Sequence, residues 1–123
     1  MRQILQRFAR CHALVVGDLM IDEYLWGEVD RISPEAPVQI VSVQREDLTL
    51  GGAGNVVNNL AALGARVSVA GVVGTGADGR RMLELFAALG ADTRGVVQDE
   101  ERPTTRKTRV IASHQHVLRI DRE

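Results

Sequence analysis

Aromatic side chains and cysteine are scarce in this chain of 123 residues. Aromatics make up 3% of it, so the core must be built from Val, Leu, Ile and Ala. The single cysteine, Cys11, excludes an internal disulfide, fits a reducing compartment and is expected as a small core residue. No apolar run approaches the roughly 18 residues that a membrane-spanning helix needs. The charged N-terminus lacks the apolar core of a signal peptide, so we expect a cytoplasmic protein.

An excess of one charge is absent too. Lys and Arg number 15 and Asp and Glu 16, for a net charge of -1. This balance gives no bulk electrostatic reason to expect nucleic acid or an anionic membrane as a partner. His114 and His116 are expected on one face of a strand, but two histidines without a third ligand rarely bind a metal, and no metal site is expected.

Short apolar runs alternate with segments of helical spacing in the middle of the chain. The spacing predicts strands at 12–17, 66–73 and 94–97, and helices at 56–63 and 80–89 that end at Gly64 and Gly90. This succession predicts an α/β fold with a parallel sheet flanked by helices.

Two further regions, 24–43 and 104–121, alternate more and contain no helical spacing. They predict a smaller antiparallel sheet beside the parallel one. The chain stops directly after a strand, with no helix to cover the bare sheet edge. We therefore expect an incomplete, N-terminal portion of a larger domain.

Three glycines and an asparagine occupy the expected strand-to-helix connection at 51–55 (Gly51, Gly52, Gly54 and Asn55). Glycine lets the backbone approach a ligand closely, and a helix N-terminus offers free N–H groups with partial positive charge. The Asn55 amide can both donate and accept hydrogen bonds. The segment is thus either a site for a polyhydroxylated or anionic small molecule or simply a tightly packed connection.

A second glycine run matches G-x-G-x-x-G through Gly74, Gly76 and Gly79, after one expected strand and before a helix. Asp99 follows about twenty residues on, where dinucleotide-binding folds place an acid on the ribose. A dinucleotide-binding module is therefore an alternative. Against it, the preceding strand is not the first of the chain, and Asp99 lies in a polar run typical of a loop tip.

The two glycine runs and their surroundings together resemble a known family. Gly51-Gly52-Ala53-Gly54-Asn55, then Gly64 and Gly74, is similar in spacing to the N-terminal signature of the ribokinase-like (pfkB) carbohydrate kinases. Gly17-Asp18, followed by Asp22, resembles the family's first strand and its sugar-binding acid. The string Arg31-Ile32-Ser33-Pro34-Glu35-Ala36-Pro37, with Thr108-Arg109-Val110 and Arg119-Ile120-Asp121, resembles more specifically the bacterial D-glycero-β-D-manno-heptose-7-phosphate kinases.

The resemblance implies transfer of the γ-phosphoryl of ATP to the anomeric hydroxyl of a heptose 7-phosphate, in the ADP-heptose pathway to the lipopolysaccharide core. ATP and Mg²⁺ would be bound mainly by a C-terminal half absent from this chain. The family's catalytic base is an Asp in a Gly-Ala-Gly-Asp string, which does not occur here. We therefore expect no catalytic residue in this chain and no kinase activity from it alone.

The resemblance also implies a set of substrate-binding residues. Asp18 and Asn55, with the backbone of Gly51 and Gly52, would bind sugar hydroxyls. The cations expected near the substrate phosphate are Arg31, Lys107 and Arg109. The alternative for the last two is that, with Arg106, they form a solvated strand face.

On the same resemblance, the strands at 24–43 and 104–121 would form a lid over the sugar. Tyr24, Leu25 and Trp26 are expected to form an exposed apolar surface on it, which favours a homodimer through the lid strands; packing within the monomer is the alternative. A non-catalytic binding or dimerisation module is the third possible class.

Overall fold

The computed structural model describes all residues from 1 to 123 and contains two sheets and three α-helices. The parallel strands are β1 (His12–Val16), β4 (Arg66–Gly74) and β5 (Asp92–Asp99). The second sheet contains β2 (Leu19–Ile32), β3 (Gln39–Gly52), β6 (Thr105–Ala112) and β7 (Gln115–Arg122). The helices are α1 (Arg2–Arg7), extended by a 3-10 turn at Phe8–Arg10, α2 (Ala53–Ala62) and α3 (Ala77–Ala88).

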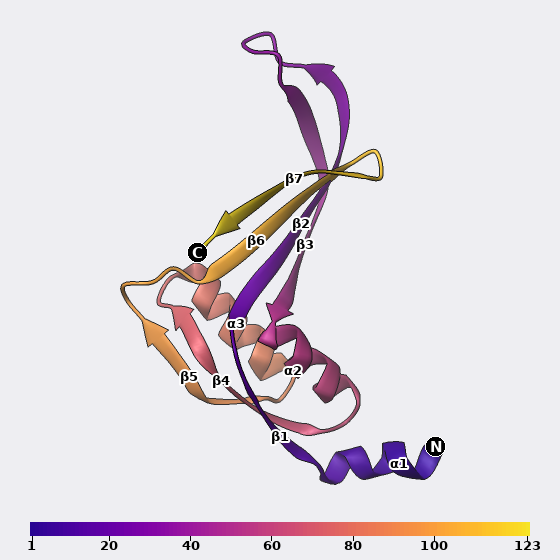
Figure 1. Ribbon diagram of the computed structural model, residues 1–123, viewed down its shortest axis with the longest axis vertical. Helices are drawn as coiled ribbons and strands as arrows, with labels where there is room; N and C mark the ends of the chain where they lie inside the picture. Colours follow the sequence, from indigo (N-terminus) through magenta and orange to yellow (C-terminus); the bar gives the residue numbers. More distant parts are fainter.

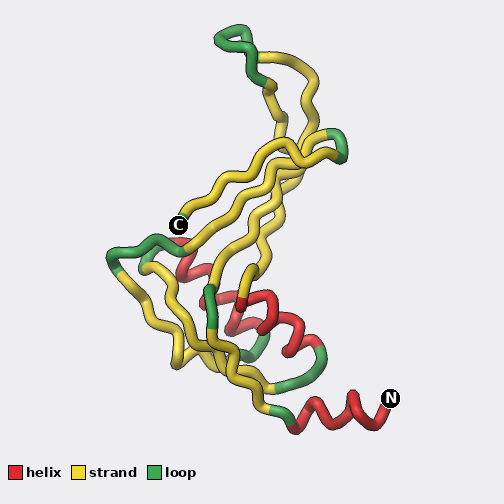
Figure 2. Tube along the Cα trace, viewed as in Figure 1, coloured by secondary structure: helices red, strands yellow, loops and turns green.

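The parallel sheet has the strand order β1-β4-β5 and follows the predicted strand–helix alternation. Both helices end as predicted, at glycines with positive φ: +93° at Gly64 after α2 and +73° at Gly90 after α3. A left-handed residue at this position stops a helix by turning its backbone out of the helical path. Figure 2 shows α2 and α3 beside the strands, with α1 apart from both sheets.

The second sheet, called the lid sheet from here on, confirms the prediction of a separate sheet and has the order β3-β2-β6-β7. The β2–β3 and β6–β7 pairs are antiparallel, and β2 and β6 run parallel. The strands are longer than predicted, because β2 begins at Leu19 and β3 continues to Gly52. The missed part of β3 contains Gln44-Arg45-Glu46-Asp47, a polar stretch that an edge strand exposed to water tolerates.

The β2–β3 hairpin projects beyond the rest of the lid sheet (Figure 1). Strand β6 pairs with β2 only as far as Gly27, whereas β2 continues to pair with β3 up to Ile32. Tyr24 and Trp26 are half-buried on one face of β2, and Leu25 points to the other. The lid-mediated homodimer stays a prediction.

Two local predictions were wrong. Cys11 is exposed, because it lies in the link between the 3-10 turn and β1 and not within the sheet. His114 does not share a strand face with His116, because Ser113 and His114 form the β6–β7 turn, with φ of 51° and 65°. Two consecutive residues of positive φ are typical of the tight turn whose twist matches a hairpin.

A single apolar core joins the two sheets. Leu19, Ile21 and Leu50 enter it from the lid sheet, and Phe86 and Met82 enter it from α3. Val67, Val69 and Val73 of β4 complete the contact with the helices, together with Val57 of α2. The start of β2 and the end of β3 are thus part of the core, which ties the base of the lid sheet to the parallel sheet. None of the helices is long and apolar enough to span a bilayer.

The first turn of α3 packs directly against the end of β4. A Cβ on Gly79 would collide with the carbonyl oxygen of Gly74, whereas a Cβ on Gly76 would meet nothing within 4 Å. Gly76 also has an ordinary extended backbone, with φ of -82°. Position 79 therefore has no room for a side chain, whereas position 76 has room for one.

We predict that Gly79→Ala lowers the free energy of unfolding by about 1–3 kcal/mol, as overpacking a tight contact does. Gly76→Ala is the matched control and should cost less than about 1 kcal/mol, the scale of a changed helix cap. Denaturant unfolding of the two variants measures the difference. Equal losses would contradict this packing of α3 on β4.

Candidate functional site

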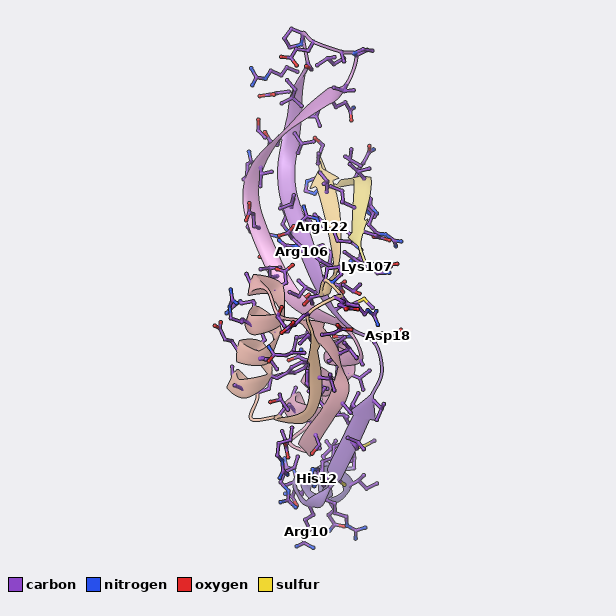
Figure 3. The ribbon with its side chains drawn as sticks, turned by 90° about the vertical axis from the view of Figure 1, so that its left-hand side faces the viewer. Arg10, His12, Asp18, Arg106, Lys107 and Arg122 are labelled. Atoms are coloured by element: carbon purple, nitrogen blue, oxygen red, sulfur yellow. The ribbon has the colours of Figure 1, made fainter.

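A pocket of about 320 Å³ lies where the parallel sheet meets the base of the lid sheet. It opens at the carboxyl ends of β1 and β4, the edge where open parallel sheets bind their ligands. Its charged and polar lining comprises Asp18, Lys107, Arg102, Thr105 and Glu123. Figure 3 shows Asp18 and Lys107 near one another at this junction, halfway along the molecule, with Arg10 and His12 at its lower end.

Asp18 reaches the pocket because the link between β1 and β2 lies directly on β4. The N–H of Gly17 donates to the carbonyl of Ala70 at 3.3 Å. A Cβ on Gly71 would lie 2.8 Å from the Gly17 carbonyl oxygen and 2.7 Å from Leu19, so only glycine allows this approach. Asp18 is exposed, and its carboxylate is available to accept hydrogen bonds from a ligand.

The end of β3 holds this link from the other side. The carbonyl of Asp18 accepts the N–H of Ala53, the first residue of α2, at 2.8 Å. Gly52 has φ of +56°, and a Cβ there would lie 2.5 Å from that same carbonyl oxygen. A Cβ on Gly51 would lie 2.6 Å from a carboxylate oxygen of Asp22. Close packing therefore requires glycine at both Gly51 and Gly52. The same packing places Asp18 and Asp22 near the start of α2.

Asn55 lies in the first turn of α2 and is exposed. Its side chain does not line the pocket of Asp18 and Lys107. A role for Asn55 in binding a hydroxyl stays a prediction.

Lys107 comes to the pocket from β6, in register with Asp22 of β2. Its ammonium lies 3.8 Å from the carboxylate of Glu123. The sequence did not single out Arg102 or Thr105, which share this lining. Thr105 could have been found, because it lies two residues before Lys107 and so on the same face of the strand.

Arg109 continues this face of β6 but does not line the pocket. Its guanidinium binds the Asp22 carboxylate at 3.2 Å and lies 5.5 Å from the centre of the Tyr24 ring. Tyr24 stacks on Trp26, with the ring centres 6.0 Å apart, and Arg45 covers Trp26 at 4.6 Å. Arg109 is thus the first cation of a stacked row that follows the lid away from the pocket.

Arg31 is not brought to the pocket within one chain. It pairs with Ile40 near the end of the projecting hairpin, whereas the pocket is lined by Met20 at the start of the same strand. At about 3.3 Å per residue, the separation is roughly 35 Å. Its predicted contact with a substrate phosphate has no support from this placement.

Arg106 lies on the opposite face of β6, so a single solvated face with Lys107 and Arg109 does not exist. Its side chain is only 20% exposed. The guanidinium forms ion pairs with Glu23 and, at 2.8 Å, with Asp78 in the first turn of α3. Burial acts to lower the pKa of Arg106, but the hydrogen bond with Glu23 and the charges of both acids outweigh it, and the net shift is upward.

Packing also explains two glycines of the second run, Gly74 and Gly79, but not Gly76, whose Cβ would meet nothing within 4 Å. A Cβ on Gly74 would lie 2.7 Å from the carbonyl oxygen of Arg102, and the Gly74 N–H donates to the Thr104 hydroxyl at 2.8 Å. Asp99 ends β5, and its carboxylate accepts the N–H of Glu101 at 2.9 Å. These contacts give Gly74 and Asp99 structural roles that need no bound dinucleotide.

The fold and the pocket define a class: an α/β protein with a polar pocket at the carboxyl edge of a parallel sheet, next to a second sheet, the usual place of a ligand site in such folds. The model of the pfkB family of carbohydrate kinases matches residues 12–123. The chain belongs to this family.

Individual relatives agree with this assignment. The chain is 65% identical over 116 residues to the bifunctional protein HldE of Desulfatibacillum aliphaticivorans, an alignment that covers 94% of this chain and 24% of that protein. The chain thus spans about a quarter of the length of the curated relatives it matches.

Solved structures show the same fold. A carbohydrate kinase from Agrobacterium tumefaciens superposes with a TM-score of 0.70 at 20% identity, over 90% of this chain and 35% of that one. A ribokinase from Cryptococcus neoformans in complex with ADP superposes with a TM-score of 0.66 at 22% identity, over 90% of this chain and 34% of that one. The predicted ribokinase-like fold is therefore confirmed.

The glycine at 52 offers a sharp test of how the site is built. Gly52→Ala should destabilise the protein by about 3 kcal/mol or more, because a positive-φ penalty of about 1–2 kcal/mol adds to the collision with the Asp18 carbonyl. Gly64→Ala is the control: it carries a positive φ too, but its Cβ would meet nothing within 4 Å. Chemical denaturation compares the two, and similar losses would refute the close approach of β3 to Asp18.

Proposed function

We propose that this chain is the N-terminal, sugar-binding part of an ATP-dependent kinase that acts on D-glycero-D-manno-heptose 7-phosphate. The transferred group would be the γ-phosphoryl of ATP and the acceptor the anomeric hydroxyl, in the pathway to ADP-heptose and the lipopolysaccharide core. The observation that carries the proposal is the meeting of Asp18 and Lys107 in one pocket. The resemblance of the string 31–37 to heptose-7-phosphate kinases and the 65% identity to a protein HldE support the choice of sugar.

The pocket suits a sugar that bears a phosphate. The Asp18 carboxylate accepts hydrogen bonds from hydroxyl groups, and the Thr105 hydroxyl both donates and accepts them. Lys107 and Arg102 supply positive charge for a phosphate, which cations bind with short, charge-assisted hydrogen bonds. A rigid pocket of this kind would hold the acceptor hydroxyl for in-line transfer, which is the main requirement of phosphoryl transfer.

The remaining parts of the reaction would come from outside these residues. The chain contains no group of three or more His, Cys, Asp or Glu side chains arranged to hold a metal ion. We propose that ATP, Mg²⁺ and the base that takes the hydroxyl proton are held mainly by the rest of the protein. The role of this chain is then to bind and orient the sugar in the cytoplasm.

We predict different effects of two pocket substitutions on binding to the full-length protein. Asp18→Asn should weaken heptose 7-phosphate and unphosphorylated heptose alike, by about 10- to 100-fold, the value of a hydrogen bond to a charged group. Lys107→Met should weaken only the phosphorylated sugar, by a similar factor. Arg119→Met is the control, because Arg119 pairs with Asp121 on the exposed strand β7, outside the pocket.

Isothermal titration calorimetry measures these affinities, and release of ADP in the presence of the sugar measures transfer. A wild-type protein that binds both sugars equally, or a Lys107→Met variant that prefers the phosphorylated sugar as strongly as the wild type does, contradicts the phosphate assignment. Sugar binding without release of ADP would support the non-catalytic binding module. Binding of NAD in place of sugar would support the dinucleotide module.

A further inference from the structure

A partly buried cluster of charges joins the lid sheet to the layer of helices. Arg106 of β6 bridges Glu23 of β2 and Asp78 of α3. The Thr108 hydroxyl donates to the second oxygen of Glu23 at 2.9 Å. The Nε–H of Arg106 is buried without a partner, so the guanidinium is held through its two terminal nitrogens alone.

The Arg106–Asp78 contact is the one ion pair between the lid sheet and the rest of the protein. Every other ion pair lies within the lid sheet, within α3 or within β5. The apolar core also joins the two layers, but apolar burial has no preferred direction. A charge-assisted hydrogen bond between partly buried groups is directional, because it requires defined positions of donor and acceptor.

This cluster and the pocket lie on opposite faces of strand β6. Along a strand, consecutive side chains point to opposite faces. Arg106 points toward α3, and its neighbours Thr105 and Lys107 line the pocket. Asp22, the residue before Glu23, likewise points to the face opposite Glu23, where it binds Arg109. A shift of strand β6 relative to α3 would therefore carry both Arg106 and Lys107 with it.

We propose that Arg106 and Asp78 are positioning residues, which hold the lid sheet at the height over the parallel sheet that places Lys107 for the substrate phosphate. The link to the substrate rests on the proposed function; the link to the position of the lid does not. The sequence does not assign this role, because Arg106 is separated from both acids by long stretches of chain.

Asp78→Ala is the most informative variant. It removes the bridge to α3 and leaves the Arg106–Glu23 pair within the lid sheet intact. Its matched control is Glu84→Ala, which removes the exposed Arg81–Glu84 pair from the same helix without touching the lid. Thermal unfolding of both variants checks that each still folds.

The first measurement needs no ligand. Spin labels on Gln115 of β7 and Asn59 of α2, both exposed, report the distance from the lid sheet to the helices in the full-length protein with its native cysteines, Cys11 included, replaced by Ser. The distance distribution should broaden in Asp78→Ala and stay unchanged in Glu84→Ala. An unchanged distribution in Asp78→Ala overturns the proposal, whether or not the protein binds a sugar.

The second measurement tests the link to the pocket. Asp78→Ala should raise KM for heptose 7-phosphate about 5- to 20-fold and leave KM for ATP within about twofold, since the defect is one of sugar placement. If it acts through Lys107, the double variant with Lys107→Met should be no worse than Lys107→Met alone. Additive losses overturn the link to Lys107. If the distance distribution broadens in Asp78→Ala but the wild-type protein does not bind heptose 7-phosphate, the positioning role stands and the proposed function is rejected.

Discussion

The alternation of side chains along β2 and β6 is the constraint on which the rest of the structure depends. Each strand buries one face against the helices and turns the other to the pocket. Ile21 enters the core, while Met20 lines the pocket beside it. Arg106 and Lys107 repeat this division on β6. The packing that stabilises the fold thus also sets the positions of the side chains that line the pocket.

Close backbone approach at glycines completes this arrangement. Gly52 lies against the Asp18 carbonyl, and Gly71 lies beneath the link that carries Asp18. Three segments distant in the chain therefore meet at one point: the end of β1, the end of β3 and the middle of β4. The glycine run at 51–54 resembles a ligand-binding turn, but its first effect here is to let the end of β3 pack closely against the link between β1 and β2. Its effect on the pocket is to hold the backbone of Asp18 in place.

Much of the fold could be predicted from the sequence, because α2, α3 and β4 have strong periodicity and glycine caps at their ends. The polar part of β3 could not, since an edge strand gains its stability from pairing with β2 and not from its own composition. Asp18 and Lys107 were predicted site residues, and the structure brings them together. Arg106 was misjudged because its burial depends on Glu23 and Asp78, whose proximity only the tertiary fold creates.

We propose that one small pocket, between the parallel sheet and the lid sheet, holds the phosphorylated sugar. A crystal structure of the full-length protein with heptose 7-phosphate tests it most directly. We expect sugar hydroxyls within hydrogen-bonding distance of the Asp18 carboxylate and the phosphate against Lys107 or Arg102. A sugar bound away from Asp18, or a phosphate held at the Gly74–Gly79 turn with Lys107 free, would contradict it.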